Sequence, residues 1–293
     1  MKKSYIKYIS ALLLFGSNGI IASRISLSSY EIVLSRTLIG GLFLVAIYTL
    51  GKNKPIFLKD KKTSLCLLVS GIAMGANWLF LYEAYKQIGV SISTLACYCG
   101  PVILMALAPL TFGEKDTPAK IIGMLSVLLG MFCVYGAELM KNGFSWGLVF
   151  GILSAVMYPI MVIFNKKAKN VSGIENSMSQ LVVAFFIVAL FTLLKDGGVF
   201  SVPKGSLLPI ILLGIVNTGF GCYLYFSSLT ALPAQTVAIC GYLEPLSALG
   251  FSALFLHERL TSIQLIGALL VLGGAAFAEL FRSRRKQTSE SAQ

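Results

Sequence analysis

The chain has 293 residues, of which 56% are hydrophobic and 12% charged, and its formal net charge is +12. Because soluble globular chains carry about 25% charged residues, this composition excludes an ordinary soluble domain and indicates a protein embedded in a membrane. The 24 basic residues lie almost wholly in short loops between apolar stretches. This is a topology signal rather than a phosphate-binding face, so we expect no nucleic-acid partner.

Ten apolar segments are long enough to cross a bilayer, which needs about 20 apolar residues per helix. In chain order they are Tyr5–Ala22, Glu31–Leu50, Ser64–Tyr85, Ser91–Phe112, Ala119–Gly136, Ser145–Phe164, Ile174–Leu194, Ser206–Leu229, Ala234–Leu256 and Thr261–Leu280. None alternates polar and apolar residues as a barrel strand does. The Met1-Lys2-Lys3 start imitates a signal peptide, but we interpret it as the beginning of an uncleaved first helix. The sequence therefore predicts an all-α polytopic protein of ten transmembrane helices.

Lysine and arginine are distributed unequally between the two sides of this predicted topology. The side of the two termini holds 17 of them and the opposite side holds six, while Arg36 lies within a helix. Cytoplasmic loops carry the excess of basic residues in membrane proteins. We therefore expect a multi-pass protein of the cell membrane with both its N- and C-termini in the cytoplasm.

The sequence also repeats itself at a distance of 144 residues. Between Tyr98 and Gly130, 11 of 33 positions are identical to the positions 144 residues later, and the matches include a Tyr, a Pro, a Glu and two Gly. We expect two five-helix repeats, at residues 1–142 and 143–281, followed by a basic and polar tail at 282–293 that is frayed. Because five is odd, the second repeat enters the membrane inverted, as in many secondary transporters.

Each repeat carries a proline near the middle of a predicted helix. Pro101 removes the helical partner of the Cys97 carbonyl, and Pro245 removes that of the Gly241 carbonyl. Freed carbonyls at membrane depth are tolerated where they line a water-filled cavity or pack against another helix. The pair indicates either a substrate site between the fourth and ninth segments or kinks that serve packing alone.

Glu244 lies close to the expected midplane of the ninth segment, and its counterpart in the first repeat is Gly100. A carboxylate at this depth costs about 2.5 kcal/mol or more, so it should face a cavity, find a partner or take up a proton. We favour a role in binding a substrate amine or in proton coupling. The alternative is a structural acceptor for neighbouring hydroxyl or amide groups.

Arg36 carries a permanent charge within the second segment. It could hold a substrate carboxylate, pair with Glu83 or cap loose carbonyls, and a structural role is at least as well supported as a binding role. Glu83 and Lys86 are three residues apart near the end of the third segment, so we expect a surface ion pair there.

Aromatic and amide side chains supply further candidates for the site. Trp78 and Tyr82 share a face of the third segment with two glycines and could wall a pocket for an amine or an aromatic group. Both could instead be packing or interface residues. The remaining candidate substrate-binding residues are Asn77, Tyr98, Tyr242, Asn18, Tyr158 and Asn217, although interhelical hydrogen bonding is the commoner role for buried amides. Glycine seams at Gly123/Gly130 and Gly267/Gly274 could pack within the monomer or between monomers, which leaves monomer and homodimer open.

Several of these residues together resemble a known family. An Arg in the second segment (Ser35-Arg36-Thr37), Leu243-Glu244-Pro245, and the exits Gly113-Glu114-Lys115 and His257-Glu258-Arg259 are similar to those of EamA-type drug/metabolite transporters. One departure is Phe15-Gly16-Ser17-Asn18, where the family often has Trp-Gly-Ser-Asn. The resemblance implies the transport of amino acids, amines or other small metabolites and leaves the substrate open.

No residue pattern indicates an enzyme. The sole histidine, His257, has no HExxH spacing, and none of the six cysteines has CxxC spacing, so we expect no metal and no cofactor and interpret the cysteines as packing residues. A GxxxxGK[ST] loop is missing from the sequence, so ATP does not drive this chain directly. We expect a secondary-active transporter that exports an amino acid or amine-like solute by alternating access, with proton or exchange coupling open. A channel or a membrane receptor is the alternative.

Overall fold

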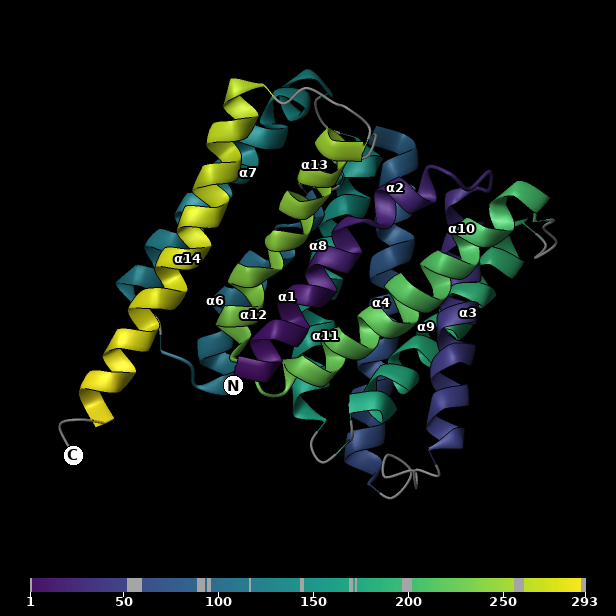
Figure 1. The fold of residues 1–293 in the computed structure, drawn as a ribbon, viewed down its shortest axis with the longest axis horizontal. Coiled ribbons are helices and arrows are strands. Elements are labelled where there is room, and N and C mark those ends of the chain that lie inside the picture. The colour runs from purple at the N-terminus through teal and green to yellow at the C-terminus, as the bar shows by residue number, and fades with distance from the viewer. Residues whose placement is uncertain are drawn as a thin grey trace.

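A computed structural model describes residues 2–51, 60–88, 93, 96–115, 117–142, 145–168, 171, 173–196, 202–255 and 261–290, and every element in these ranges is a helix. The helices are α1 (Lys2–Gly16), α2 (Asn18–Ala22), α3 (Ser29–Leu50), α4 (Lys61–Ile88), α6 (Gly100–Phe112), α7 (Pro118–Asn142), α8 (Trp146–Lys167), α9 (Gly173–Asp196), η1 (Lys204–Ser206), α10 (Leu207–Leu212), η2 (Leu213–Phe220), α11 (Gly221–Leu229), α12 (Ala234–Gly241), α13 (Leu243–Phe255) and α14 (Ser262–Glu290). The all-α prediction is confirmed for the described residues (Figure 1).

Seven helical segments in the described part of the chain are long and apolar enough to cross a membrane. They are Lys2–Ala22, Ser29–Leu50, Lys61–Ile88, Trp146–Lys167, Gly173–Lys195, Lys204–Leu229 and Ala234–Phe255. Three shorter apolar helices accompany them, at Gly100–Phe112, Pro118–Cys133 and Leu265–Ala278. The protein is therefore a multi-pass membrane protein, and each of the ten predicted segments contains a helix.

Local sequence explains where several helices begin and end. Ser28 and Glu31 form a capping box at the start of α3, in which each side chain bonds the backbone of the other residue. Asp60 precedes α4 and accepts a hydrogen bond from the Thr63 hydroxyl, which holds the pKa of its carboxyl below its ordinary value. Gly113 ends α6 with a φ of 65°, a left-handed conformation that glycine adopts at little cost.

The two halves of the chain interlock rather than lie apart as separate bodies. In the first half, α4 packs against α8 and α9 of the second. In the second half, η2 and α11 pack in the same way against α3 and α1 of the first. The main hydrophobic core draws on residues from both halves, from Tyr8 in α1 to Ala278 in α14.

Two long helices, α7 and α14, lie side by side at one edge of the bundle (Figure 1). A Cβ atom on Gly123 would lie 2.6 Å from the Gly274 carbonyl oxygen, and one on Gly130 would lie 2.5 Å from the Gly267 carbonyl oxygen. The earlier glycine of α7 thus meets the later glycine of α14, so the two helices run antiparallel. The glycine seam is a contact within the chain.

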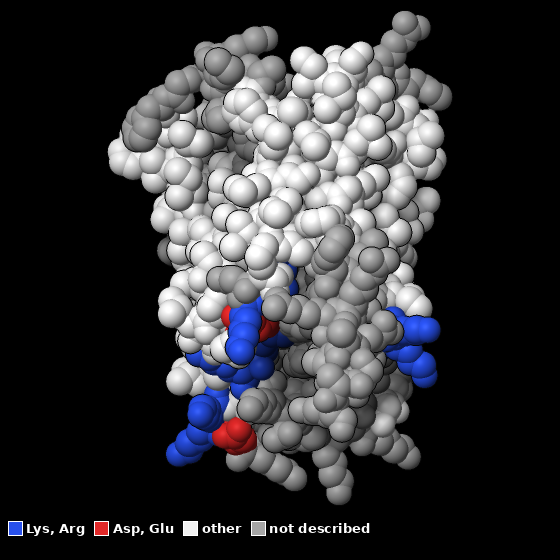
Figure 2. All heavy atoms as spheres, turned by 90° about the vertical axis from the view of Figure 1, so that its left-hand side faces the viewer, with Lys and Arg blue, Asp and Glu red and all other residues white. Residues whose placement is uncertain are grey.

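On one face of the molecule, the charged side chains lie toward one end. Figure 2 shows the face formed by α7 and α14, where the charged side chains of the described residues gather in the lower half and leave the upper half uncharged. Large apolar side chains such as Leu110, Leu208 and Leu254 are exposed around the bundle, as a surface in contact with lipid requires.

Two sequence-based expectations need correction. Glu83 pairs with Lys195 at 2.9 Å, not with Lys86, because α9 packs against α4 and brings that lysine to the end of the helix. The tail after Phe281, expected to fray, continues α14 as helix to Glu290. Extending an existing helix needs no new nucleus, and Arg, Lys, Gln and Glu are good helix formers.

Candidate functional site

Both helices that contain a mid-segment proline are broken at the predicted place. In the second half, α12 ends at Gly241, Tyr242 lies between the helices, and α13 begins at Leu243. In the first half, Tyr98 and Cys99 form a turn directly before α6 begins. Pro101 and Pro245 therefore each lie in the first turn of the helix that follows the break, where a missing N–H costs nothing.

The two breaks meet each other in space. The Tyr242 hydroxyl donates a hydrogen bond to the Tyr98 carbonyl at 2.6 Å, and the centroids of the two rings are 5.8 Å apart. Tyr98 and Tyr242 are 144 residues apart, which is the period of the repeat. A residue in contact with its own counterpart lies at the axis that relates the two halves, so the breaks lie at the centre of the molecule's internal symmetry.

Glu244 lies in the first turn of α13, two residues after Tyr242, and is half-buried. The Tyr98 side chain forms a hydrogen bond with its carboxylate, and the charge of Arg36 acts on it from a distance. No ion pair among the described residues includes Glu244. Its carboxylate thus lies beside the two breaks and is held by a neutral phenol, while Arg36 contacts Thr218 and Trp78.

Three further tyrosines bring their hydroxyl groups to the same break. A Cβ atom on Gly241 would lie 3.6 Å from the Tyr158 hydroxyl and 3.7 Å from the Tyr8 hydroxyl, so both oxygens face the backbone of the break. Tyr8 donates to the Val237 carbonyl at 2.9 Å, and Tyr225 donates to the Tyr158 hydroxyl at 3.5 Å. The centre of the molecule is therefore a polar cluster of phenols within an otherwise apolar core.

Arg36 is buried and bound on two sides. Its guanidinium lies over the Trp78 ring at 4.8 Å, and its Nε donates to the Thr218 hydroxyl at 2.9 Å. Thr218 in turn donates to the Leu213 carbonyl at 2.8 Å within η2, a π-helical stretch of the kind often found at functional sites. The proposed pair of Arg36 with Glu83 does not form, since Lys195 takes that carboxylate.

The three candidate asparagines are all engaged with protein atoms. Asn217 donates to the Leu14 carbonyl at 2.7 Å and to the Asn18 side-chain oxygen at 3.0 Å, across the short break between α1 and α2. Asn77 donates to the carbonyl and hydroxyl oxygens of Ser154 at 2.8 and 2.9 Å and so joins α4 to α8. These contacts are the interhelical role that buried amides commonly have.

The aromatic stripe on α4 divides between two regions. Trp78 packs against the main core and also against a smaller cluster around Tyr30 and Val188, whereas Tyr82 packs against the smaller cluster only, with its ring 5.2 Å from that of Tyr85. Trp78 therefore connects with the central residues through Arg36, and Tyr82 belongs to the packing at one end of the bundle.

Two residues of this centre, and one that binds the start of α12, are not among the site residues predicted from the sequence. Tyr8 and Thr218 are each a single polar residue in an apolar segment, with no spacing that links them to the breaks. The sequence marks Glu114 as a helix exit, and the structure shows that its carboxylate binds the start of α12. The motif Gly113-Glu114-Lys115 is the sequence signal that marks Glu114 as a candidate functional residue. Among the described residues no group of acidic, cysteine or histidine side chains could hold a metal ion, and His257 lies outside them.

Comparison with known proteins gives the family. The model of the EamA-like transporter family matches the chain twice, at residues 2–136 and 145–279. The chain belongs to the EamA-like transporter family. The double match agrees with the internal duplication, and membership confirms the resemblance seen in the sequence.

Relatives of this EamA protein are named as transporters. The uncharacterized transporter YxxF of Bacillus subtilis is 24% identical over 92% of this chain and 88% of its own. A protein of Salmonella typhimurium named "Probable amino-acid metabolite efflux pump" is 25% identical over 80% of this chain and 82% of its own. A solved crystal structure aligns over 97% of this chain and 98% of its own with a TM-score of 0.83 and 20% identity, so the fold is shared. The protein is a membrane transporter of the EamA family.

Proposed function

We propose that this EamA protein is a secondary transporter that moves a small amino acid or amine-like solute out of the cell by alternating access. The proposal includes ten spans in two inverted repeats, 1–142 and 143–281, with both termini in the cytoplasm. The antiparallel course of α7 and α14, whose glycines are repeat counterparts, supports the inverted arrangement. The basic end of the molecule in Figure 2 is then the cytoplasmic end.

The meeting of the two helix breaks at Tyr98 and Tyr242 carries this proposal. Broken helices near the membrane midplane, at the interface of inverted repeats, are the usual site of substrate in secondary transporters. An ionisable side chain at this depth is expensive and is kept for a function. Glu244 lies beside both breaks, with a tyrosine as its hydrogen-bond partner.

The chemistry around the breaks fits a solute with an ammonium group. The Glu244 carboxylate can accept charge-assisted hydrogen bonds, and the rings of Tyr98, Tyr242 and Tyr158 supply aromatic faces and hydroxyls around it. Arg36 and Trp78 stand at one side of this centre, where a substrate carboxylate would find a guanidinium. The name of the Salmonella relative is consistent with an amino-acid solute.

Proton coupling at Glu244 is a second role for the same carboxylate. Tyr98 holds the carboxyl by a hydrogen bond, but no described cation pairs with it, so protonation would break no ion pair. A proton and a substrate ammonium would then compete for one group. Such competition is the simplest way to couple efflux to proton entry.

Counterflow in proteoliposomes tests the proposal against a channel or a receptor. Vesicles preloaded with a candidate amino acid or amine, and given a trace of the labelled solute outside, should accumulate the label transiently and saturably. A carrier exchanges solute across the membrane, whereas a channel shows no saturable exchange and a receptor shows no flux. The panel of solutes is first narrowed by ligand-induced thermal stabilisation of the purified protein.

A further inference from the structure

The helix α12 begins without a cap from its own segment. Its N-cap residue is Pro233, which makes no side-chain hydrogen bond to the helix. The Glu114 carboxylate, from the loop between α6 and α7, instead accepts the Ala234 N–H at 2.6 Å and the Gln235 N–H at 3.1 Å. The first N–H groups of a helix have no partner within it, and a negative charge is favoured there. One half of the protein thus caps a helix of the other half.

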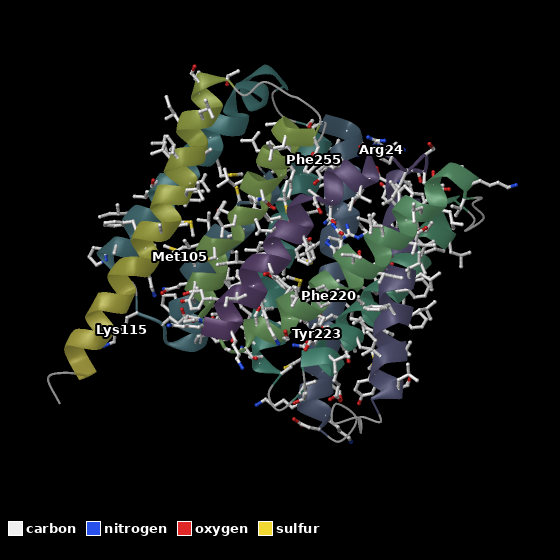
Figure 3. The ribbon with its side chains drawn as sticks, viewed as in Figure 1. Arg24, Met105, Lys115, Phe220, Tyr223 and Phe255 are labelled. Carbon is white, nitrogen blue, oxygen red and sulfur yellow. The ribbon has the colours of Figure 1, made fainter. Side chains whose placement is uncertain are left out.

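Two lysines, one from each half, bind close to this junction, and Lys120 bonds across it. Lys120, at the start of α7, is buried and donates to the side-chain oxygen of Gln235. Lys166, at the end of α8, donates to the Leu229 carbonyl at 2.8 Å and to the Leu232 carbonyl, which places a cation at the carbonyl end of α11. The loop that holds Glu114 lies at the end of the bundle marked by Lys115, opposite Arg24 (Figure 3).

The ninth apolar segment is enclosed on one side of its break and open on the other. Every residue of α12 is buried, including the polar Gln235 and Thr236, which are 0% exposed. Of the described side chains of α13, only Pro245 is buried, and Glu244 is half-buried. The protein therefore encloses the segment between the break and Glu114 and leaves the other segment partly uncovered.

We infer that Glu114 is the latch of an inner gate, which holds α12 against the first half and closes the cytoplasmic end of the transport pathway in this conformation. The inference rests on the proposed function. An alternating-access cycle must uncover the site from the cytoplasm, and α12 cannot move away from the first half while the Glu114 carboxylate holds its first two N–H groups. Removing the carboxylate favours the inward-open state, because the cap is lost from the closed state only.

The test measures access to α12 and needs no substrate. In a variant with all six cysteines replaced, Ala238→Cys places a thiol in the middle of α12, where Ala238 is 0% exposed. An impermeant maleimide is applied to inside-out membrane vesicles. Because the cap is lost from the closed state only, Glu114→Gln should accelerate labelling by about tenfold, and Glu114→Ala by at least as much.

Two matched controls separate a gate from a general loss of structure. Ala184→Cys, in α9, is an equally buried reporter away from α12 and should stay unlabelled in Glu114→Gln. Glu31→Gln removes a carboxylate that caps a helix within its own segment and should leave Ala238→Cys protected. Unchanged labelling at Ala238→Cys, or equal labelling of both reporters, overturns the latch. Absence of counterflow in the unaltered protein defeats the transport proposal whatever the labelling shows.

Discussion

The hydroxyl of Tyr242 bonds the backbone carbonyl of Tyr98, the residue that occupies the same place in the other repeat. Ser126 and Leu270, also 144 residues apart, make a second such contact, a hydroxyl-to-carbonyl bond of 3.0 Å between α7 and α14. The axis of the internal symmetry therefore passes through the pair of helix breaks and also through the glycine seam. In each contact only one half supplies the hydroxyl group and the other half supplies a backbone carbonyl. The side chains therefore do not follow the symmetry of the backbone.

Removal of the Tyr242 hydroxyl should weaken the junction of the two breaks. In Tyr242→Phe the Tyr98 carbonyl loses its donor at a place where the backbone already lacks helical partners. We expect the free energy of unfolding to fall by about 1 kcal/mol, which a denaturant titration in micelles measures. Tyr223→Phe is the control, because Lys7 lies over that ring and no described residue bonds its hydroxyl. Equal effects of the two changes would contradict the assigned role.

Neutralising Glu244 separates its two proposed roles. Glu244→Gln keeps the shape of the side chain and the contact with Tyr98, and it removes the charge. If Glu244 couples protons, the variant should still exchange solute in counterflow but lose uphill transport driven by a pH gradient. If Glu244 binds an ammonium group, both activities and the ligand-induced thermal stabilisation should fall together. Full retention of transport driven by a pH gradient leaves Glu244 as a structural residue.

Substitution by alanine at two neighbouring glycines of α14 should change the stability of the protein in opposite directions. A Cβ atom on Gly274 would lie 2.7 Å from the Gly123 carbonyl oxygen, whereas one on Gly273 meets nothing within 4 Å. Gly274→Ala should cost about 1–3 kcal/mol of stability by forcing α7 away from α14. Gly273→Ala should gain about 0.5–1 kcal/mol, because alanine loses less backbone freedom in a helix. Thermal unfolding of the two variants side by side is the measurement, and a stable Gly274→Ala would refute the close seam.

Sidedness can be measured on whole cells. With the native cysteines replaced, Lys195→Cys should react with an impermeant thiol reagent on intact cells, because the proposed topology puts the end of α9 outside. Lys61→Cys, at the start of α4, should react only after the cells are permeabilised. Both lysines are exposed, so burial does not confuse the comparison. Labelling of Lys61→Cys in sealed cells would reverse the assignment of the cytoplasmic end.

The features that depend on local chemistry can be predicted from the amino-acid sequence. Pro101 and Pro245 indicate the two helix breaks, because a proline lacks the N–H that a helix interior needs. Pro109 and Pro159 lie inside α6 and α8, so a proline alone does not determine a break. The repeat, the family resemblance and the membrane class can also be recognised from the sequence, because identical residues and long apolar segments are visible without a structure. The glycines of α7 and α14 marked a close contact, although only the structure decided that the contact lies within the chain.

The partner of each polar side chain depends on how distant segments of the chain pack together. Arg36 meets Thr218, Glu114 meets the start of α12, and Lys195 takes the carboxylate of Glu83, each across more than 100 residues of chain. Inside a membrane, apolar periodicity tells which segments are helices but not how they are arranged, because every helix is apolar on most of its surface. Once packing has interlocked the two halves, the fold determines which polar group lies next to each of these side chains.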